Sequence, residues 1–219
     1  MTGLSPLLHA RQMTAGFAQS RAAFVAAAEW FLATTGQVGS RWEEPGLGEW
    51  DVRALVGHTS RSFLTIETYL AQPATAVDIA TTADYYRATR EIAAGPAVAE
   101  RGREAGAALG EDPTTELARI AARVLPLVAA QDGTALLTTI AGGMRLTDYL
   151  PTRTFELTVH TADLATALGL PVDPPAAAAR EALQIVTDLA VDDGRAGVLL
   201  LAATGRPALP TGFSVLAGV

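Results

Sequence analysis

The sequence predicts a mainly all-α fold, and three observations support this. Apolar residues recur three and four positions apart through several long segments, which is the spacing of a helix face. Ser, Thr or Asp precedes several of these segments and Gly or Pro follows them, as at helix ends. Of the 219 residues, 49% are hydrophobic and 18% charged, which is enough apolar material for a core. We expect a main helical domain over residues 1–170 and a small helical or α+β extension over residues 171–219, packed on it.

Helix start and stop signals divide the first 130 residues into four helical segments. A Ser-Pro pair opens the first, Asp51 caps the second, and Gly95-Pro96 interrupts the third. The loop 36–50 is rich in Gly and Pro and carries two tryptophans that we expect to hold it against the helices. The expected helices cover residues 6–36, 51–72, 81–110 and 114–130.

The second part of the chain begins with a β-prone run and ends in a tail with strand-like and turn-like pieces. A turn at Gly142-Gly143 leads from the β-prone run into a long helix, which ends at Gly169. Two shorter helices follow a cluster of prolines. The expected segments are an extended run at 134–140, helices at 144–169, 176–190 and 195–203, and a tail at 205–219.

The helix expected over 144–169 carries a row of polar residues between two apolar edges. At about 100° per residue, the row falls within an arc of roughly 80°. Its members are Tyr149, Arg153, Glu156, His160 and Asp163. The opposite side, with Thr154, Thr158, Thr161 and Ala165, is expected to face solvent. Burying a carboxylate, an imidazole and a guanidinium among leucines is costly unless they are paired or bind a metal, so this row predicts a functional site.

Composition excludes several classes of chemistry. The chain has no Cys, so a thiolate metal site and a protein thiol nucleophile are absent, and any metal must be bound by His, Asp or Glu. All 16 basic residues are Arg, which removes a P-loop lysine and a Schiff-base lysine. The net charge of −7 disfavours nucleic-acid binding, and no apolar run is long enough to cross a membrane. We expect a cytoplasmic protein, either a monomer or a homodimer, with small-molecule partners.

The polar row contains part of a candidate ligand set. Glu156 and His160 are separated by one helical turn, so their side chains meet, and His58 can approach them from another helix across a bundle core. Two imidazoles and a carboxylate can bind Zn²⁺, or Fe²⁺, Mn²⁺ or Ni²⁺, with one position left open. Asp163 is placed to accept from an imidazole N–H, and Arg153 to neutralise a substrate carboxylate or pair with an acid of the row. Spacing alone leaves a metal site and a metal-free salt-bridge network equally open.

Three blocks of sequence resemble a known family. They are WDVRALVGH at 50–58, TRTFELTVHTADLATAL at 152–168 and GRPALPTGFSVL at 205–216. Together they are similar to the mycothiol-dependent maleylpyruvate isomerase family of the DinB-like superfamily, over roughly residues 10 to 216. The resemblance implies a DinB-like four-helix bundle with a divalent metal, usually zinc, at His58, Glu156 and His160. It also implies mycothiol, a low-molecular-weight thiol of actinobacteria, as a cofactor.

These observations favour one function and leave two alternatives. A thiol bound to a metal loses its proton near neutral pH and then attacks electrophiles, and in a chain without Cys its sulfur comes from the cofactor. The leading interpretation is a zinc- and mycothiol-dependent transferase or cis–trans isomerase of a small electrophilic substrate, with Arg153 and Asp163 as catalytic residues. The alternatives are a non-catalytic metal-binding bundle and a metal-dependent hydrolase with Asp163 as general base.

Overall fold

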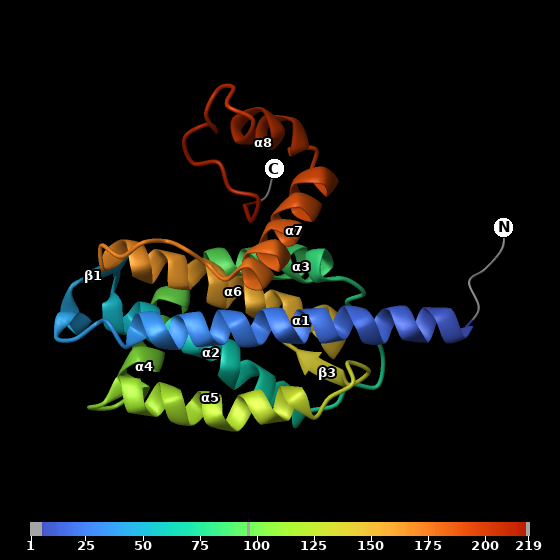
Figure 1. The fold of residues 1–219 in the computed structure, drawn as a ribbon, viewed down its shortest axis with the longest axis horizontal. Helices are drawn as coiled ribbons and strands as arrows, with labels where there is room; N and C mark the ends of the chain where they lie inside the picture. Colours follow the sequence, from blue (N-terminus) through green and yellow to red (C-terminus); the bar gives the residue numbers. More distant parts are fainter. Residues whose placement is uncertain (1–5, 96, 218–219) are drawn as a thin grey trace.

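The fold is mainly helical, as predicted (Figure 1). The computed structural model describes residues 6–95 and 97–217. Its helices are α1 (Pro6–Thr35), α2 (Val52–Leu70), α3 (Thr82–Ala94), α4 (Ala97–Ala108), α5 (Pro113–Ala129), α6 (Leu146–Ala167), α7 (Ala176–Asp192) and α8 (Ala196–Ala203). A short 3₁₀ helix, Arg41–Glu43, lies between α1 and the first strand. Two antiparallel hairpins pair β1 (Pro45–Leu47) with β2 (Trp50–Asp51) and β3 (Leu136–Thr139) with β4 (Gly142–Arg145).

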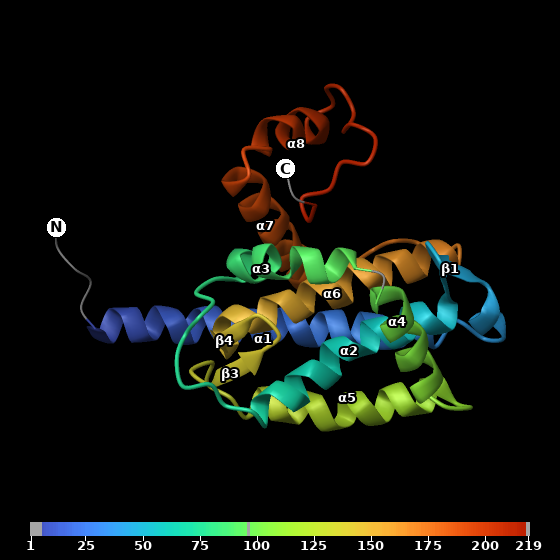
Figure 2. The same ribbon diagram turned by 180° about the vertical axis from the view of Figure 1, so that it is seen from behind.

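Four long helices form the predicted bundle. Each of α1, α2, α5 and α6 packs against two of the others, so that α1 contacts α5 and α6, and α2 also contacts α5 and α6 (Figures 1 and 2). The interior between them is filled by fully buried aromatic and aliphatic side chains, including Phe24, Phe31, Phe63, Leu117 and Leu150. The aromatic residues contact one another at this centre, with Phe24 and Phe63 edge to face and their ring centroids 5.9 Å apart. The bundle thereby provides a rigid frame for α2 and α6.

A close glycine contact brings α4 against α2. A Cβ atom built on Gly57 of α2 would lie 2.1 Å from the backbone nitrogen of Gly106 in α4, so only glycine fits at this crossing. Gly102 of α4 likewise approaches the Trp50 ring, which a Cβ there would meet at 2.5 Å. Because Gly57 immediately precedes His58, this crossing places α4 and Trp50 beside that histidine.

Several local predictions are confirmed. Asp51 caps α2, its carboxylate accepting a hydrogen bond of 2.7 Å from the backbone N–H of Ala54. The helical segment 81–110 is split at the predicted Gly-Pro break into α3 and α4. Trp50 is buried, and both it and the partly buried Trp42 pack on the bundle, as expected for the loop between α1 and α2.

Two boundaries and one element differ from the predictions. The chain turns at Ile140 and Ala141, two residues before the expected turn at Gly142-Gly143, and those glycines lie within β4. The long helix therefore begins at Leu146 and not at 144, because pairing with β3 holds Met144 and Arg145 in a strand. The tail contains turns and bends but no strand in its described part.

The expected solvent side of α6 is buried, so that prediction was wrong. Thr154, Thr158 and Thr161 are all inaccessible where α6 packs on α1 and α7. Thr158 donates a hydrogen bond of 2.7 Å to the backbone carbonyl of Thr154, one turn earlier in the same helix. A threonine whose hydroxyl bonds its own helix exposes only a methyl group to its neighbours, and can therefore be buried. Within α6 only Thr166 is exposed.

The C-terminal helices lie on one side of the bundle (Figure 2). The helix α7 packs on α6 and α1 through Ala178, Ile185 and Leu189, whereas α8 contacts α7 and has no buried residue of its own. Beyond α8 the chain returns toward α6, and Val215 packs in the same cluster as Tyr86 and Phe155. In the described part of the chain, no helix combines the length and apolarity needed to cross a bilayer.

Candidate metal centre

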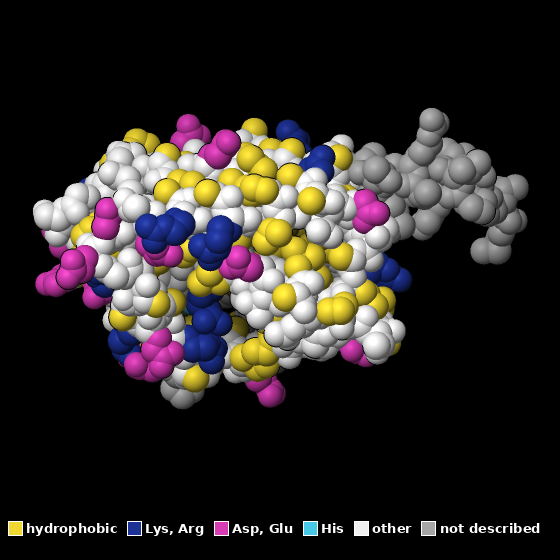
Figure 3. All heavy atoms as spheres, turned by 90° about the horizontal axis from the view of Figure 1, so that it is seen from below, with side chains coloured by type: hydrophobic (Ala, Val, Ile, Leu, Met, Phe, Trp, Pro, Cys, Tyr) yellow, Lys and Arg dark blue, Asp and Glu magenta, His cyan; other side chains and the backbone are white. Residues whose placement is uncertain are grey.

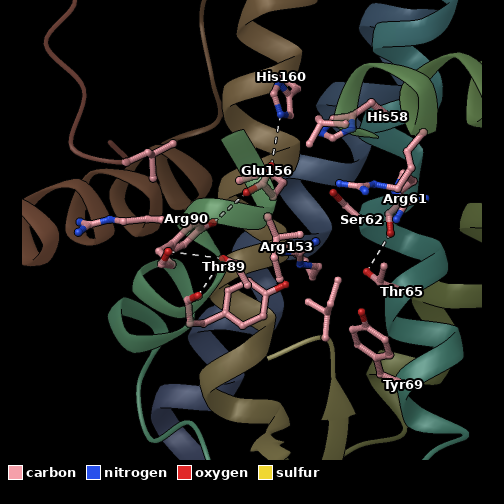
Figure 4. Close-up of a pocket in the computed structure, with 18 of the residues that line it drawn as sticks. His58, Arg61, Ser62, Thr65, Tyr69, Thr89, Arg90, Arg153, Glu156 and His160 are labelled. Atoms are coloured by element: carbon pink, nitrogen blue, oxygen red, sulfur yellow. Dashed lines mark hydrogen bonds and ion pairs between the residues drawn. The ribbon is translucent and has the colours of Figure 1, made fainter. Parts of the chain in front are cut away.

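His58, Glu156 and His160 meet at one point in the structure. His58 comes from α2, and Glu156 and His160 from successive turns of α6 (Figure 4). One ligand atom from each residue lies within 4.8 Å of the ligand atoms of the other two. The His160 Nε2 atom is 3.3 Å from Glu156 Oε2, and the two imidazole rings stand edge to face with centroids 4.9 Å apart. The helical spacing and the packing of α2 on α6 together bring the predicted set together.

Aromatic and acidic neighbours hold the two imidazoles. The Trp50 ring lies over His58 with centroids 4.5 Å apart, and the Trp50 indole N–H is itself anchored by a hydrogen bond of 2.9 Å to the carbonyl of Ala99 in α4. The Nδ1 atom of His160 lies 3.0 Å from Asp163 Oδ2. When Asp163 accepts the Nδ1 proton, Nε2 is left as the nitrogen that faces Glu156, which is the orientation a metal ligand requires.

The three groups shift one another's protonation. Burial and the nearby charge of His160 lower the pKa of His58 to about 4. Burial raises the pKa of Glu156, but the hydrogen bond and charge of His160 outweigh it and bring that pKa to about 2. Burial lowers the pKa of His160, whereas its hydrogen bonds to Asp163 and Glu156 raise it to about 9. Without a metal, His58 is thus neutral at pH 7, Glu156 is ionised and His160 is a cation.

The residues fit a divalent cation. The Nδ1 atom of His58 is buried and has no hydrogen-bond partner among the described residues, a costly state for a polar atom. Two nitrogens and an oxygen are a borderline donor set suited to Zn²⁺ and its neighbours. Ligands of a tetrahedral zinc lie about 3.3 Å apart when the bonds are about 2.0–2.1 Å, and the separation of His160 from Glu156 is 3.3 Å. Loading the site would displace one proton from His160.

Arg153 is buried next to the ligand set without a carboxylate partner. Its side chain stacks over the ring of Tyr149, with 4.9 Å between the guanidinium carbon and the ring centroid, and its Nε donates to Thr152 Oγ1 at 2.9 Å. No described carboxylate lies within ion-pair distance of it, so the pairing with Glu156 or Asp163 that we considered from sequence is absent. The salt-bridge network comprises Glu156, His160 and Asp163 alone.

Three further residues of the site were missed by the sequence analysis. The Tyr86 hydroxyl lies 3.2 Å from Glu156 Oε1, but nothing in the sequence of α3 indicates this contact. Trp50 was expected to pin a loop and not to cover a ligand. Arg61 follows His58 by three positions on α2 and lines the same cavity, so helical spacing alone was a usable signal.

A cavity of about 360 Å³ reaches the candidate metal centre. His58, Glu156 and His160 all line it, together with Arg153 and Tyr86 (Figure 4). Tyr149, the first residue of the polar row, is fully buried outside the cavity, and Asp163 lies behind His160. The cavity falls within the size range of small-molecule sites.

Comparison with known proteins gives a single family assignment. No curated protein and no solved structure matches the chain. The family model described as the mycothiol maleylpyruvate isomerase N-terminal domain matches residues 31–165, which include His58, Glu156 and His160. The third block of the predicted resemblance, at 205–216, lies outside this match. Since the match covers more than half of the sequence, the chain belongs to the mycothiol maleylpyruvate isomerase N-terminal domain family.

Proposed function

We propose that the protein is a metal-dependent enzyme that uses mycothiol to attack a small electrophilic substrate, as an S-transferase or a cis–trans isomerase. The observation that carries the proposal is the cavity of about 360 Å³ that opens directly onto all three candidate ligands. A purely structural metal is enclosed by four protein ligands, whereas a catalytic one retains an open position. The family description supports the thiol, and the absence of Cys means that the sulfur comes from outside the chain.

The metal would lower the pKa of a bound thiol, so that a thiolate is present near neutral pH. The protein residues prepare for this. His58 is neutral and Glu156 ionised at pH 7, so both are ready to bind, and Asp163 holds the Nδ1 proton of His160. Burial by Trp50 and the tyrosines restricts water around the reacting groups.

Arg153 and Tyr86 have separate roles in the proposal. The guanidinium of Arg153 is fixed by aromatic stacking and by Thr152, so its terminal nitrogens are positioned to bind an anionic group of the substrate. The hydroxyl of Tyr86 stays protonated because burial and the charge of Glu156 both raise its pKa. Tyr86 can donate to Glu156 Oε1 and orient the carboxylate, leaving Oε2 toward His160.

The test is a thiol-transfer assay on metal-loaded protein. We expect about one metal ion per chain by elemental analysis after purification without chelator. The loaded protein should consume an activated alkene or epoxide only when mycothiol is present, and should lose this activity in chelator. Turnover of ester substrates without thiol would favour the hydrolase. A loaded protein that is inert toward a broad panel of electrophiles would favour the non-catalytic metal-binding bundle.

A further inference from the structure

The cavity at the metal centre has two chemically different parts. Its interior, which we call the floor, contains the partly buried metal ligands with the buried residues Ser62, Tyr85 and Arg153. Three large apolar lining residues remain exposed and therefore lie at the opening, and we call them the rim. The rim consists of Ile92 at the end of α3, Ile140 in the turn between β3 and β4, and Leu216 in the tail, with 40%, 56% and 36% of their surfaces exposed.

The rim brings together apolar residues from three elements that are distant in the sequence. An isolated exposed leucine or isoleucine needs no explanation on a protein surface. Here, however, all three line one cavity that is also lined by Val98 of α4. Several apolar side chains lining one functional cavity are typical of a site that receives an apolar group of its ligand.

Away from the rim, the cavity is lined by four arginines, of which Arg90 is paired with Asp193 and the other three lack an acidic partner. Arg61, Arg101 and Arg153 line the cavity, and none of them forms an ion pair with a described residue. Arg61 and Arg101 also make no side-chain hydrogen bond within the described chain. Several other arginines of the described chain are paired with acids, as Arg123 is with Glu67 through two bonds of 3.1 Å. Figure 3 shows basic and acidic side chains lying next to one another on the face seen from below.

The positive charges lie in the same cavity as the metal centre. Arg61 follows His58 by about one turn of α2, and Arg153 precedes Glu156 by about one turn of α6, so both arginines line the cavity beside the ligand set (Figure 4). Arg153 also lies over the ring of Tyr85, with 5.7 Å between the guanidinium carbon and the ring centroid. In a chain with a net charge of −7, this is a local positive site. Arginines that line one cavity without acidic partners favour the binding of an anionic ligand.

We infer that the electrophile taken by this site is an amphipathic carboxylate, with its carboxylate bound by Arg61 and Arg153 and an aryl or short alkyl group at the rim. This inference rests on the proposed function and adds the substrate class to it. The cavity of about 360 Å³ limits the apolar part to one ring or a few carbons. Arg153 provides a rigid bidentate fork, and Arg61 supplies the second charge.

A saturated, unreactive probe tests the inference apart from catalysis. 3-Benzoylpropionate carries both a carboxylate and a phenyl group, its methyl ester lacks the charge, and 4-oxopentanoate lacks the ring. Titration calorimetry on the zinc-loaded full chain should show 3-benzoylpropionate binding about tenfold or more tightly than either comparator. Equal affinity for the ester would refute the carboxylate contact, and equal affinity for 4-oxopentanoate would refute the role of the rim.

Two variants separate the two contacts. Arg61→Gln should weaken binding of 3-benzoylpropionate about tenfold and leave the ester unaffected, while Ile140→Ser should weaken the two phenyl compounds and leave 4-oxopentanoate unaffected. Arg123→Gln removes an exposed, paired arginine and should change none of the three affinities. An Arg61→Gln protein that binds 3-benzoylpropionate normally would show that Arg61 does not contact the carboxylate, and would overturn the inference.

The unsaturated analogue distinguishes failure of the inference from failure of the proposed function. trans-3-Benzoylacrylate has the same charge and ring but an alkene that accepts thiols. If the saturated probe shows the expected selectivity and the alkene is not consumed with mycothiol, the substrate class stands and the thiol chemistry is wrong. If the alkene is consumed no faster than 4-oxo-2-pentenoate or the corresponding ester, the chemistry stands and the substrate class is wrong.

Discussion

The polar side chains on two sides of α6 satisfy their hydrogen-bonding groups in different ways. One side directs Arg153, Glu156 and His160 into the cavity, and the other packs Thr154 and Thr158 against α1 and α7. Both sides are polar in sequence, and the threonine side is buried whereas Glu156 and His160 on the cavity side are partly buried. The threonines satisfy their hydroxyls with carbonyls of their own helix, whereas the charged residues depend on groups from other elements and on one another.

This difference shows which buried polar groups indicate a ligand site. A hydroxyl that donates a hydrogen bond within its own helix is already satisfied and needs no ligand. An imidazole nitrogen without a partner, as in His58, and a guanidinium without an acid, as in Arg153, are incomplete without a ligand. Substitutions on the two sides of α6 should therefore differ in their effects, and the largest effect is expected at the metal ligands.

Among substitutions on the cavity side of α6, Glu156→Gln should reduce zinc affinity most. The change keeps the size of the side chain but removes a charged ligand, so we expect zinc affinity to fall more than about 100-fold, beyond the loss typical of outer-shell partners. Denaturant unfolding with chelator and with excess Zn²⁺ measures this. At 100 times the dissociation constant, zinc should stabilise the wild type by about 2.7 kcal/mol and the variant far less. Equal stabilisation of both proteins would remove Glu156 from the ligand set.

Raising the pH from 6 to 8 should strengthen zinc binding about 100-fold. His160, with its pKa of about 9, must lose a proton to bind, while Glu156 and His58 are already deprotonated. Affinity therefore rises about tenfold per pH unit, with one proton released. Calorimetry in buffers of different ionisation enthalpy counts that proton.

The metal-free protein should show the opposite trend with pH. Its His160 pKa is raised above the ordinary value of 6.5, so the stabilisation from this cation is complete below pH 6.5 and is lost as the pH rises through about 9. Unfolding in chelator should accordingly reveal a loss of stability between pH 6.5 and 9. A zinc affinity that does not vary over this range would contradict the assigned protonation of the metal centre.

Asp163→Asn should have an intermediate effect. The amide still occupies the position 3.0 Å from His160 Nδ1 but carries no charge, so zinc affinity should fall about tenfold. The pKa of His160 should also decrease, which an NMR titration of its imidazole can follow in the metal-free protein. A normal affinity together with an unchanged imidazole titration would show that Asp163 neither orients nor charges His160.

The threonine side should respond least. Thr158→Val removes a satisfied hydroxyl and should cost about 1 kcal/mol of unfolding free energy. The hydroxyl of Thr161 is buried without a described partner, so Thr161→Val should be neutral or slightly stabilising. Neither change should alter zinc affinity. A loss of metal binding in Thr158→Val would mean that the two sides of α6 are coupled.

The same contrast shows what sequence could and could not predict. Helical periodicity located α6 and placed Glu156 beside His160, because both depend on positions within one helix. It did not distinguish a buried threonine from an exposed one, since threonine is compatible with either setting. The contact of Tyr86 with Glu156 joins residues 70 positions apart, and its existence depends on how α3 packs on α6, which local patterns do not encode.

The arrangement of rim and floor has a consequence for engineering. The rim residues are exposed and belong to a helix end, a hairpin turn and a tail, whereas His58, Glu156 and His160 sit on helices of the bundle. Exposed positions of this kind usually tolerate replacement within about 0.5 kcal/mol. Libraries confined to Ile92, Ile140 and Leu216 can therefore retarget the cavity to new compounds while the metal ligands keep their spacing.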